Sequence, residues 1–433
     1  MQIDTNFTSE QRSAVVKLML AVKMMYYAVG LTVAYKAAMT VSLTNALYEF
    51  HFNQDKMDIF SKFGFFQYWE GSSNLDTLVR GYQSERSLDL FPGMPILLNT
   101  IFKVTGIKTA ADEPTVIAGV FLICSVFINI FLHYLNASLL YKLAKLSGCY
   151  SDHAFRICLV LLFSSSSVYH IGLFPDSLYL FAVLMAMCKL KDSQINYGSV
   201  LAAPLSNYIQ VVGWLAFACA TSKSGIFNFI YLLPTSFTLE SKKDSKSAPF
   251  QLSSSHYLKS LIGVFLVLAP WGLFTVWSFV KFCSLEPQDD SLERCSNTFI
   301  FILTSVFWTS TSLNSPWYLY WLSLTAIPIV LHALCTSFNI SMPASDKPTV
   351  DTVCSQSISN QRWVLACHSV QAMLQTTQAG RSMAGHFYYY FMLDEHQEYY
   401  YRRESPWQVY AWLSVIGGLY VGPVLYACQI AQF

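Results

Sequence analysis

The sequence predicts an all-α protein that crosses a membrane several times. Hydrophobic residues make up 54% of the chain and charged residues only 12%, about half of the roughly 25% that soluble domains carry. Many apolar residues fall in runs close to the length of about 20 that one membrane-spanning helix needs. The formal net charge of +1 also argues against a nucleic-acid partner.

Apolar runs follow one another along most of the chain. We expect about eight to ten spans among the runs at residues 15–38, 115–140, 157–171, 178–188, 200–220, 226–237, 258–279, 318–335, 363–378 and 407–430. The stretch 298–313 carries many Ser and Thr residues, which suits a re-entrant or interfacial segment better than a span. The first run holds Lys17 and Lys23 and lacks a small-residue cleavage site, so a retained helix is expected rather than a signal peptide.

Positive charges in the short connections predict how these helices are oriented. They occupy alternate connections, at Lys142, Lys145 and Arg156, at Lys189 and Lys191, and at Lys242, Lys243 and Lys246. Because basic loops stay in the cytosol, we expect the N-terminus there. With this orientation, the segments expected on the lumenal side are the loop at about 44–112, Asp176, the region 283–314 and the loop 380–406. Cys283 and Cys295 flank a polar loop in this set and can pair in an oxidising lumen.

The loop after the first apolar run carries the main cluster of carboxylates. Its acids are Asp58, Glu70, Asp76, Glu85 and Asp89. Carboxylates are suited to proton transfer, and a loop held at a membrane face is where polar chemistry on a lipid-linked substrate takes place. We therefore expect the functional site in this loop.

A series of motifs in and after this loop is shared with a known family. The loop contains a Trp-acid pair, then Gly-Tyr, Glu and Phe-Pro-x-x-Pro, carried by Trp69, Glu70, Gly81, Tyr82, Glu85, Phe91, Pro92, Gly93 and Pro95. Weaker matches follow at residues 175–178, 222–225, 283 and 389–391. In the order and spacing of these blocks, over most of its length, the chain resembles the GPI mannosyltransferase 2 family.

This resemblance implies a fold, a reaction and a location. The fold is a glycosyltransferase C type helical bundle, with residues 1–433 as one integral membrane domain of the endoplasmic reticulum. The reaction adds the second mannose of the GPI anchor, α1,6-linked, from dolichyl-phosphate-mannose to a mannosyl-glucosaminyl-phosphatidylinositol. A β-linked donor and an α-linked product require inversion, by one displacement and one general base. The sequence has no HExxH motif, so we expect neither a metal nor another cofactor, and a small accessory membrane subunit is a further candidate partner.

The resemblance also assigns roles to individual residues, and most have a structural alternative. Glu70 matches the general base, or is a solvated charge in an interfacial aromatic belt. Asp176 is the alternative base or an acceptor-orienting group, or simply a helix cap. Arg80 and Lys223 suit a lipid phosphate or interfacial snorkelling, and Glu85 suits a salt bridge within the loop. The expected substrate-binding residues are Trp69, Arg80, Tyr82, Glu85 and Lys223.

Two departures from the family pattern keep other functions open. The family has Asp where this chain has Glu70, and His near the position of Ser73. The longer side chain moves the carboxylate by about one methylene, and misplacement near 1 Å can cost about a hundredfold in rate. The alternatives are a catalytically silent homologue, a mannosyltransferase for an oligosaccharide-lipid, and a multi-pass transporter. The transporter is disfavoured because few ionisable residues fall within spans, Lys23 and His133 being the main cases.

Overall fold

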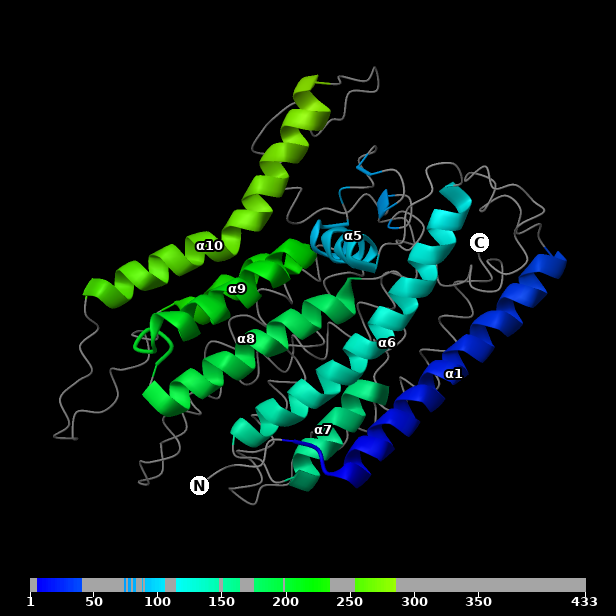
Figure 1. Ribbon diagram of the computed structural model, residues 1–433, viewed down its shortest axis with the longest axis horizontal. Coiled ribbons are helices and arrows are strands. Elements are labelled where there is room, and N and C mark those ends of the chain that lie inside the picture. Colours follow the sequence, from blue (N-terminus) through cyan, green and yellow to red (C-terminus); the bar gives the residue numbers. More distant parts are fainter. Residues whose placement is uncertain are drawn as a thin grey trace, which may run out of the picture. The chain divides into compact units, whose positions relative to one another are not determined.

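The described part of the chain is helical. The computed structural model describes residues 6–40, 74, 77–78, 81–82, 88, 90–105, 114–147, 151–163, 175–197, 199–233 and 254–285. No strand occurs among these residues, which confirms the all-α prediction for them. Their helices belong to two compact units and are labelled in Figure 1.

The first unit contains the N-terminal helices, and the second contains those that follow. The first consists of α1 (Ser9–Thr40), α5 (Gly93–Thr105), α7 (Ser151–Phe163), residues 114–141 of α6 (Pro114–Leu146) and residues 176–181 of α8 (Asp176–Tyr197). The second consists of residues 142–146 of α6, the remainder of α8, α9 (Leu205–Thr221), the 3₁₀-helix η5 (Lys223–Leu232), α10 (Ser254–Phe279) and the π-helical turns of η7 (Val280–Leu285).

A capping box starts α1. Thr8 Oγ1 accepts a hydrogen bond from Gln11 N, and Gln11 Oε1 accepts one from Thr8 N, each at 3.2 Å. This reciprocal pair satisfies two backbone donors at the helix start. The predicted run 15–38 is therefore a helix that begins several residues earlier than its apolar part.

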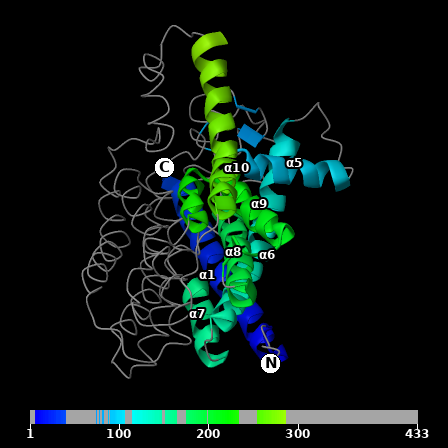
Figure 2. The same cartoon turned by 90° about the vertical axis from the view of Figure 1, so that its left-hand side faces the viewer.

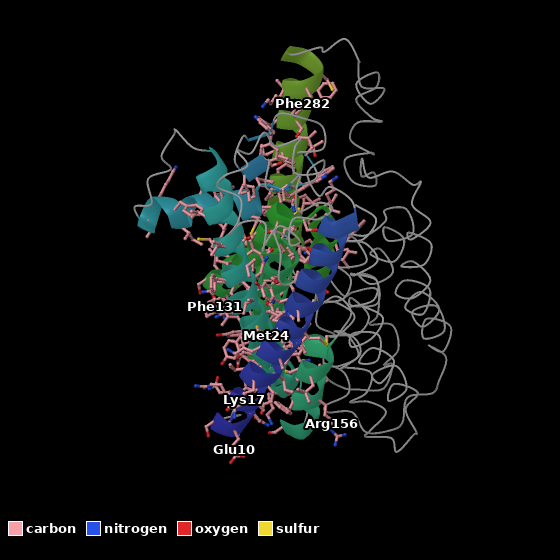
Figure 3. All side chains as sticks on the ribbon, turned by 90° about the vertical axis from the view of Figure 1, so that its right-hand side faces the viewer. Glu10, Lys17, Met24, Phe131, Arg156 and Phe282 are labelled. Atoms are coloured by element: carbon pink, nitrogen blue, oxygen red, sulfur yellow. The ribbon has the colours of Figure 1, made fainter. Side chains whose placement is uncertain are left out.

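Charged side chains of the first unit gather at one end of its helices. α1 packs against α7, and Figure 3 shows Glu10 and Lys17 of α1 at the same end as Arg156 of α7. Met24 and Phe131 lie further along α1 and α6, and both are well exposed. Charges at one end and exposed apolar groups beyond it fit helices that enter a membrane from that end.

The helices α6 and α7 form an antiparallel hairpin. Cys158 Sγ of α7 donates a hydrogen bond to the carbonyl oxygen of Ala137 on α6, at 3.1 Å. Because α7 has 13 residues, it is about 20 Å long and is shorter than the roughly 30 Å hydrocarbon core of a bilayer. The predicted run 157–171 starts inside α7, and its last residues lie outside the described part.

Within the predicted loop 44–112 the structure contains an amphipathic helix, α5, that the sequence analysis missed. Met94, Leu98 and Phe102 are all buried, at the four-residue spacing of one helix face, and Phe91 just before the helix is buried too. Phe102 meets Phe121 of α6 edge to face, with ring centroids 4.5 Å apart. The same spacing was visible in the sequence, but the run is too short to register as a membrane span.

In the second unit η5 runs back along α9. The two elements are in contact, and α10 contacts both. Tyr208 near the start of α9 donates a hydrogen bond to the carbonyl of Lys259, and Ser260 Oγ donates one to Leu232 at the end of η5, at 2.7 Å. The start of α10 therefore lies beside the start of α9 and the end of η5. The described part of the predicted span 226–237 belongs to η5, a 3₁₀ segment of 10 residues that is about 20 Å long, and residues 234–237 lie outside the described part.

The helix α10 bends in the middle and ends in an aromatic cluster. Pro270 lies inside the helix, where it removes a backbone hydrogen bond and produces a kink, and Figure 1 shows the bend. Figures 1 and 2 both show the first part of α10 alongside α9. At the far end Lys281 Nζ lies 5.5 Å from the centre of the Trp277 ring, an arrangement typical of a membrane interface.

Two helical stretches in the described part are long and apolar enough to cross a membrane. They are Ile123–Leu146 of α6 and His256–Cys283 of α10 and η7, and they correspond to the predicted runs 115–140 and 258–279. Large apolar side chains are exposed on both, as expected of lipid-facing helices: Phe127 and Phe131 on α6, and Leu261, Phe265 and Leu273 on α10.

The number of spans and the type of bundle stay predictions. The expected spans at 318–335, 363–378 and 407–430 and the interfacial segment at 298–313 lie outside the described residues. The same holds for the first part of the predicted loop 44–112. The run 178–188 is the apolar half of α8, and the run 200–220 corresponds to α9.

Candidate functional site

Three of the predicted site residues lie in the described part of the chain. Tyr82 and Asp176 belong to the first unit and Lys223 to the second. Trp69, Glu70, Arg80 and Glu85 lie outside the described residues, so their roles stay predictions, as does the expected proximity of Glu70 and Asp176.

Gly81 and Tyr82 shape the loop ahead of α5. Gly81 has a φ of 80°, a left-handed conformation that favours glycine, and its N–H donates to the carbonyl of Thr77 at 2.9 Å. This is the hydrogen bond of a helical turn that ends at a glycine. The Gly of the Gly-Tyr motif therefore has a backbone conformation that other residues rarely adopt, which is a structural reason for its presence.

Tyr82 connects this loop to Leu90, the residue before the Phe-Pro motif, by a hydrogen bond. Its hydroxyl donates a hydrogen bond to the buried carbonyl of Leu90 at 2.9 Å. Burial raises the pKa of Tyr82 above its ordinary value of 10.0, because the phenolate loses its hydration. The Tyr82 hydroxyl therefore already donates its proton to a hydrogen bond within the loop. A contact between Tyr82 and a substrate stays a prediction.

Asp176 is the first residue of α8 and is buried, with 5% of its surface exposed. A carboxylate at a helix N-terminus is stabilised by the helix dipole, which agrees with the helix-cap alternative. An aspartate that only caps a helix on the protein surface would not need to be buried, whereas Asp176 is buried. An acid inside a protein is costly unless the structure provides polar surroundings, so the neighbours of Asp176 become informative.

A polar residue of α6 holds the first turn of α8. Asn136 Nδ2 donates a hydrogen bond to the carbonyl oxygen of Ser177, at 2.9 Å and fully buried. The first turn of α8 is therefore fixed beside Asn136. At 1.5 Å per residue, Asn136 lies about 20 Å along the helix from Ile123 and about 15 Å from Leu146. Asp176, which precedes Ser177, thus lies near the middle of the membrane-length stretch of α6. Its lumenal position stays a prediction.

Asn136 is the last of four polar residues that form the α6 polar face. Ser125, Asn129, His133 and Asn136 are all fully buried. Their spacing of four, four and three residues places them on one side of the helix. Polar residues in membrane helices face the protein interior and tend to be functional. The sequence analysis noted His133 alone, although the spacing of all four was legible in the sequence.

Lys223 occupies the chain reversal between α9 and η5. Ser222 is extended, with φ −145° and ψ 143°, and its N–H closes α9 by donating to the carbonyl of Ala218 at 3.1 Å. Its hydroxyl then accepts a hydrogen bond from Ser224 N at 3.3 Å. Lys223 between them is only 5% exposed. A snorkelling lysine keeps its ammonium in water, so this burial argues against the snorkelling alternative.

The two polar sites differ in chemistry. In the first unit, Asp176 and the α6 polar face offer a proton acceptor together with neutral donors and acceptors. In the second, Lys223 offers a cation among the buried hydroxyls of Thr221, Ser222 and Ser224, a combination suited to a phosphate. Within the described residues no three His, Cys, Asp or Glu side chains are grouped as metal ligands.

Comparison with known proteins leaves these sites unassigned. No protein-family model matches the chain, and no curated protein matches it. The resemblance to GPI mannosyltransferase 2 therefore rests on the motifs quoted from the sequence.

Proposed function

We propose that the protein is a multi-pass mannosyltransferase of the endoplasmic reticulum membrane. It transfers mannose from dolichyl-phosphate-mannose to the mannosyl-glucosaminyl-phosphatidylinositol intermediate of GPI-anchor synthesis. The observation that carries the proposal is the buried carboxylate of Asp176, beside the polar face of a membrane-length helix. A buried acid within a membrane bundle is a functional-site candidate in its own right.

The proposed reaction needs one base and one group that binds phosphate. The acceptor hydroxyl oxygen attacks C1 of mannose, and the bond between C1 and the phosphate oxygen breaks with inversion. The hydroxyl proton passes to a carboxylate, either Glu70 or Asp176. Dolichyl phosphate leaves as an anion that needs no proton, and Arg80 of the loop 44–112 is suited to hold its phosphate. The substrate contact expected of Lys223 stays a prediction.

The orientation of the chain also belongs to this proposal. Cys283, at the end of the α10 stretch, is disulfide-bonded. Disulfides form in oxidising compartments, which supports a lumenal position for this end of the helix. Glycosylation tags inserted into the loop 44–112 are expected to be modified in cells. Unmodified tags would place the loop in the cytosol and contradict the assigned donor.

Complementation tests the activity. In cells that lack transfer of the second GPI mannose, we expect the wild-type chain to restore surface display of GPI-anchored proteins. If Glu70 is the base, Glu70→Gln is expected to abolish rescue at unchanged protein level. If Asp176 is the base, Asp176→Asn is expected to do so. The control is Asp192→Asn, a partly exposed acid on the same helix as Asp176, which should rescue fully. Full rescue by both site variants would rule out a carboxylate base at these positions.

A transporter is the second candidate, and one observation favours it. Lys23 and His133 are both buried, with 5% and 0% exposure, and ionisable groups inside membrane helices are typical of transport pathways. The purified chain in detergent separates the two functions, because no gradient exists there. Transfer of labelled mannose to the acceptor under these conditions identifies the enzyme, and its absence together with cellular rescue favours a transporter.

A further inference from the structure

Two neighbouring residues of α6 each take part in a hydrogen bond to a different helix. Asn136 Nδ2 donates to the carbonyl oxygen of Ser177 in α8, at 2.9 Å. The carbonyl oxygen of the next residue, Ala137, accepts a hydrogen bond from Cys158 Sγ of α7, at 3.1 Å. All four residues belong to the first unit and are fully buried. The two bonds are thus made at one level of α6, and the first of them reaches the helix that begins at Asp176.

The bond from Asn136 acts on the position of α8. The amide oxygen Oδ1 of Asn136 has no hydrogen-bond partner among the described residues, so the printed bond of this side chain is the one to α8. Its acceptor, the carbonyl of Ser177, lies inside α8, where a regular helix also supplies the N–H of the residue four positions later. The backbone of α8 is therefore satisfied without Asn136, and the bond mainly fixes where α8 begins on α6.

A hydrogen bond specifies a position more narrowly than apolar packing does. An N–H···O bond is made at donor–acceptor distances of about 2.7–3.2 Å and weakens steeply as its angle closes. A displacement of α8 along α6 by about 1 Å would therefore break the bond between Asn136 and Ser177. Asp176 directly precedes Ser177 in the first turn of α8, so the same displacement would carry its carboxylate along.

The first turn of α8 is closed and buried. Tyr179 N donates a hydrogen bond to the carbonyl oxygen of Pro175, at 2.9 Å, which closes the turn around Asp176. Ser177, Leu178 and Tyr179 are all buried. A turn of this kind moves as one body, so the bond that holds Ser177 also holds the backbone of Asp176.

We propose that Asn136 is a positioning residue for mannose transfer, acting through the first turn of α8 on the carboxylate of Asp176. The inference rests on the proposed function, in which Asp176 is one of two candidate bases. A general base must lie within hydrogen-bond reach of the hydroxyl that it deprotonates, and misplacement near 1 Å can lower a rate about a hundredfold. Asn136 touches no reacting atom in this scheme and affects the rate only through Asp176.

Kinetics of purified, monodisperse variants test this role. Asn136→Leu removes the hydrogen bond and keeps a side chain of similar size. We expect kcat to fall about 10–100-fold, with KM for donor and acceptor changed less than about twofold. A purely structural role would lower the yield or the melting temperature and leave kcat of the folded protein unchanged. The matched control is Cys158→Ala, which removes the neighbouring buried bond to α7 and should keep kcat.

Carbodiimide labelling of Asp176 tests the positioning without relying on activity. The full-length chain in lipid nanodiscs is treated with dicyclohexylcarbodiimide, which modifies protonated carboxyl groups in apolar surroundings, and the label at Asp176 is quantified by mass spectrometry. In the wild type we expect slow labelling, because the buried turn must first open. Asn136→Leu should raise the rate about tenfold, since opening no longer breaks a buried hydrogen bond. Cys158→Ala should label as the wild type does.

Several results would overturn the positioning role. They are an equal labelling rate in Asn136→Leu and the wild type, and an equal rise in Cys158→Ala, which would indicate general loosening. If Asn136→Leu gives no monodisperse protein, Asn136→Ala replaces it. Failure of both variants beside a folded Cys158→Ala shows that Asn136 is needed for assembly of the bundle, and this also overturns the proposal.

Activity and labelling together separate this proposal from the proposed function. Transfer by the wild type with an unchanged kcat in Asn136→Leu keeps the enzyme and removes the positioning role. A wild-type chain that transfers no mannose, while Asn136→Leu still speeds the labelling of Asp176, removes the mannosyltransferase and keeps the control of Asp176 by Asn136.

Discussion

Replacement of Gly225 by alanine tests the close backbone approach between η5 and α9. Gly225 lies at the start of η5, directly after the reversal that holds Lys223. A Cβ at this position would lie 2.7 Å from both Cys219 N and Ala218 O, and nearer still to the Cα of Cys219. All three are backbone atoms of the hydrogen-bonded helix α9, so none can rotate away as a side chain does.

The free-energy cost follows from this overlap. Forcing extra atoms into a packed interface costs about 1–3 kcal/mol, and rigid backbone neighbours place Gly225→Ala towards the upper part of that range. Alanine regains at most about 1 kcal/mol through its lower unfolded-state entropy. We therefore expect a net destabilisation of about 1–2 kcal/mol, with η5 displaced from α9 and Lys223 displaced with it.

The matched control is Gly213→Ala in α9. A Cβ at Gly213 meets nothing within 4 Å, and Gly→Ala inside an exposed helix stabilises by up to about 1 kcal/mol. The two substitutions have the same chemistry and opposite expected signs. The assay is the melting temperature of each purified variant in one detergent, read by the loss of monodisperse protein in size-exclusion chromatography. A melting temperature for Gly225→Ala equal to that of the wild type, or above that of Gly213→Ala, would refute the close approach of η5 to α9.

Three further outcomes are expected. Asp176→Asn keeps the shape of the side chain but removes the proton acceptor, so in-vitro mannose transfer should fall about 10²–10⁴-fold at unchanged melting temperature if Asp176 is the base. Tyr82→Phe removes the hydrogen bond to Leu90 and should cost about 1 kcal/mol. Burial raises the pKa of Tyr82 above its ordinary value of 10.0. The buried neutral phenol therefore stabilises the fold fully below about pH 10, and this contribution is lost as the pH rises further. The melting temperature of Tyr82→Phe should fall less at alkaline pH than that of the wild type. Thr8→Ala breaks the capping box and should cost about 1 kcal/mol, whereas Thr8→Ser should cost little.

The apolar runs located the membrane-length helices well. The run 115–140 lies within α6 and the run 258–279 within α10, because a segment in lipid must satisfy its own backbone hydrogen bonds, and length with composition decides whether it can. One of the short runs was misinterpreted. The run 226–237 gave no sign that residues 226–232 belong to a 3₁₀-helix packed against α9, since that depends on the close approach at Gly225.

For the candidate site, too, the sequence predicted some features and the structure alone shows the others. The motif residues Gly81 and Tyr82 were recognised, but their left-handed turn and clamp on Leu90 appear only in the structure. Asp176 was recognised as a possible base and was expected at the membrane surface. Its position beside Asn136 follows from a hydrogen bond between residues 41 positions apart, and no local pattern encodes such a pair.

By itself, the sequence determined that this protein is helical, rich in membrane-length apolar segments and equipped with acids beside them. These properties depend on composition and periodicity within single segments, where hydrophobic transfer and backbone hydrogen bonding act locally. Only the tertiary structure decided that Asp176 is buried near the middle of α6 and that Lys223 is enclosed where the chain reverses between α9 and η5. The burial of four polar residues of α6 was likewise decided by the tertiary structure. Each of these depends on which distant segments pack together, because burial and depth are properties of the assembled helices.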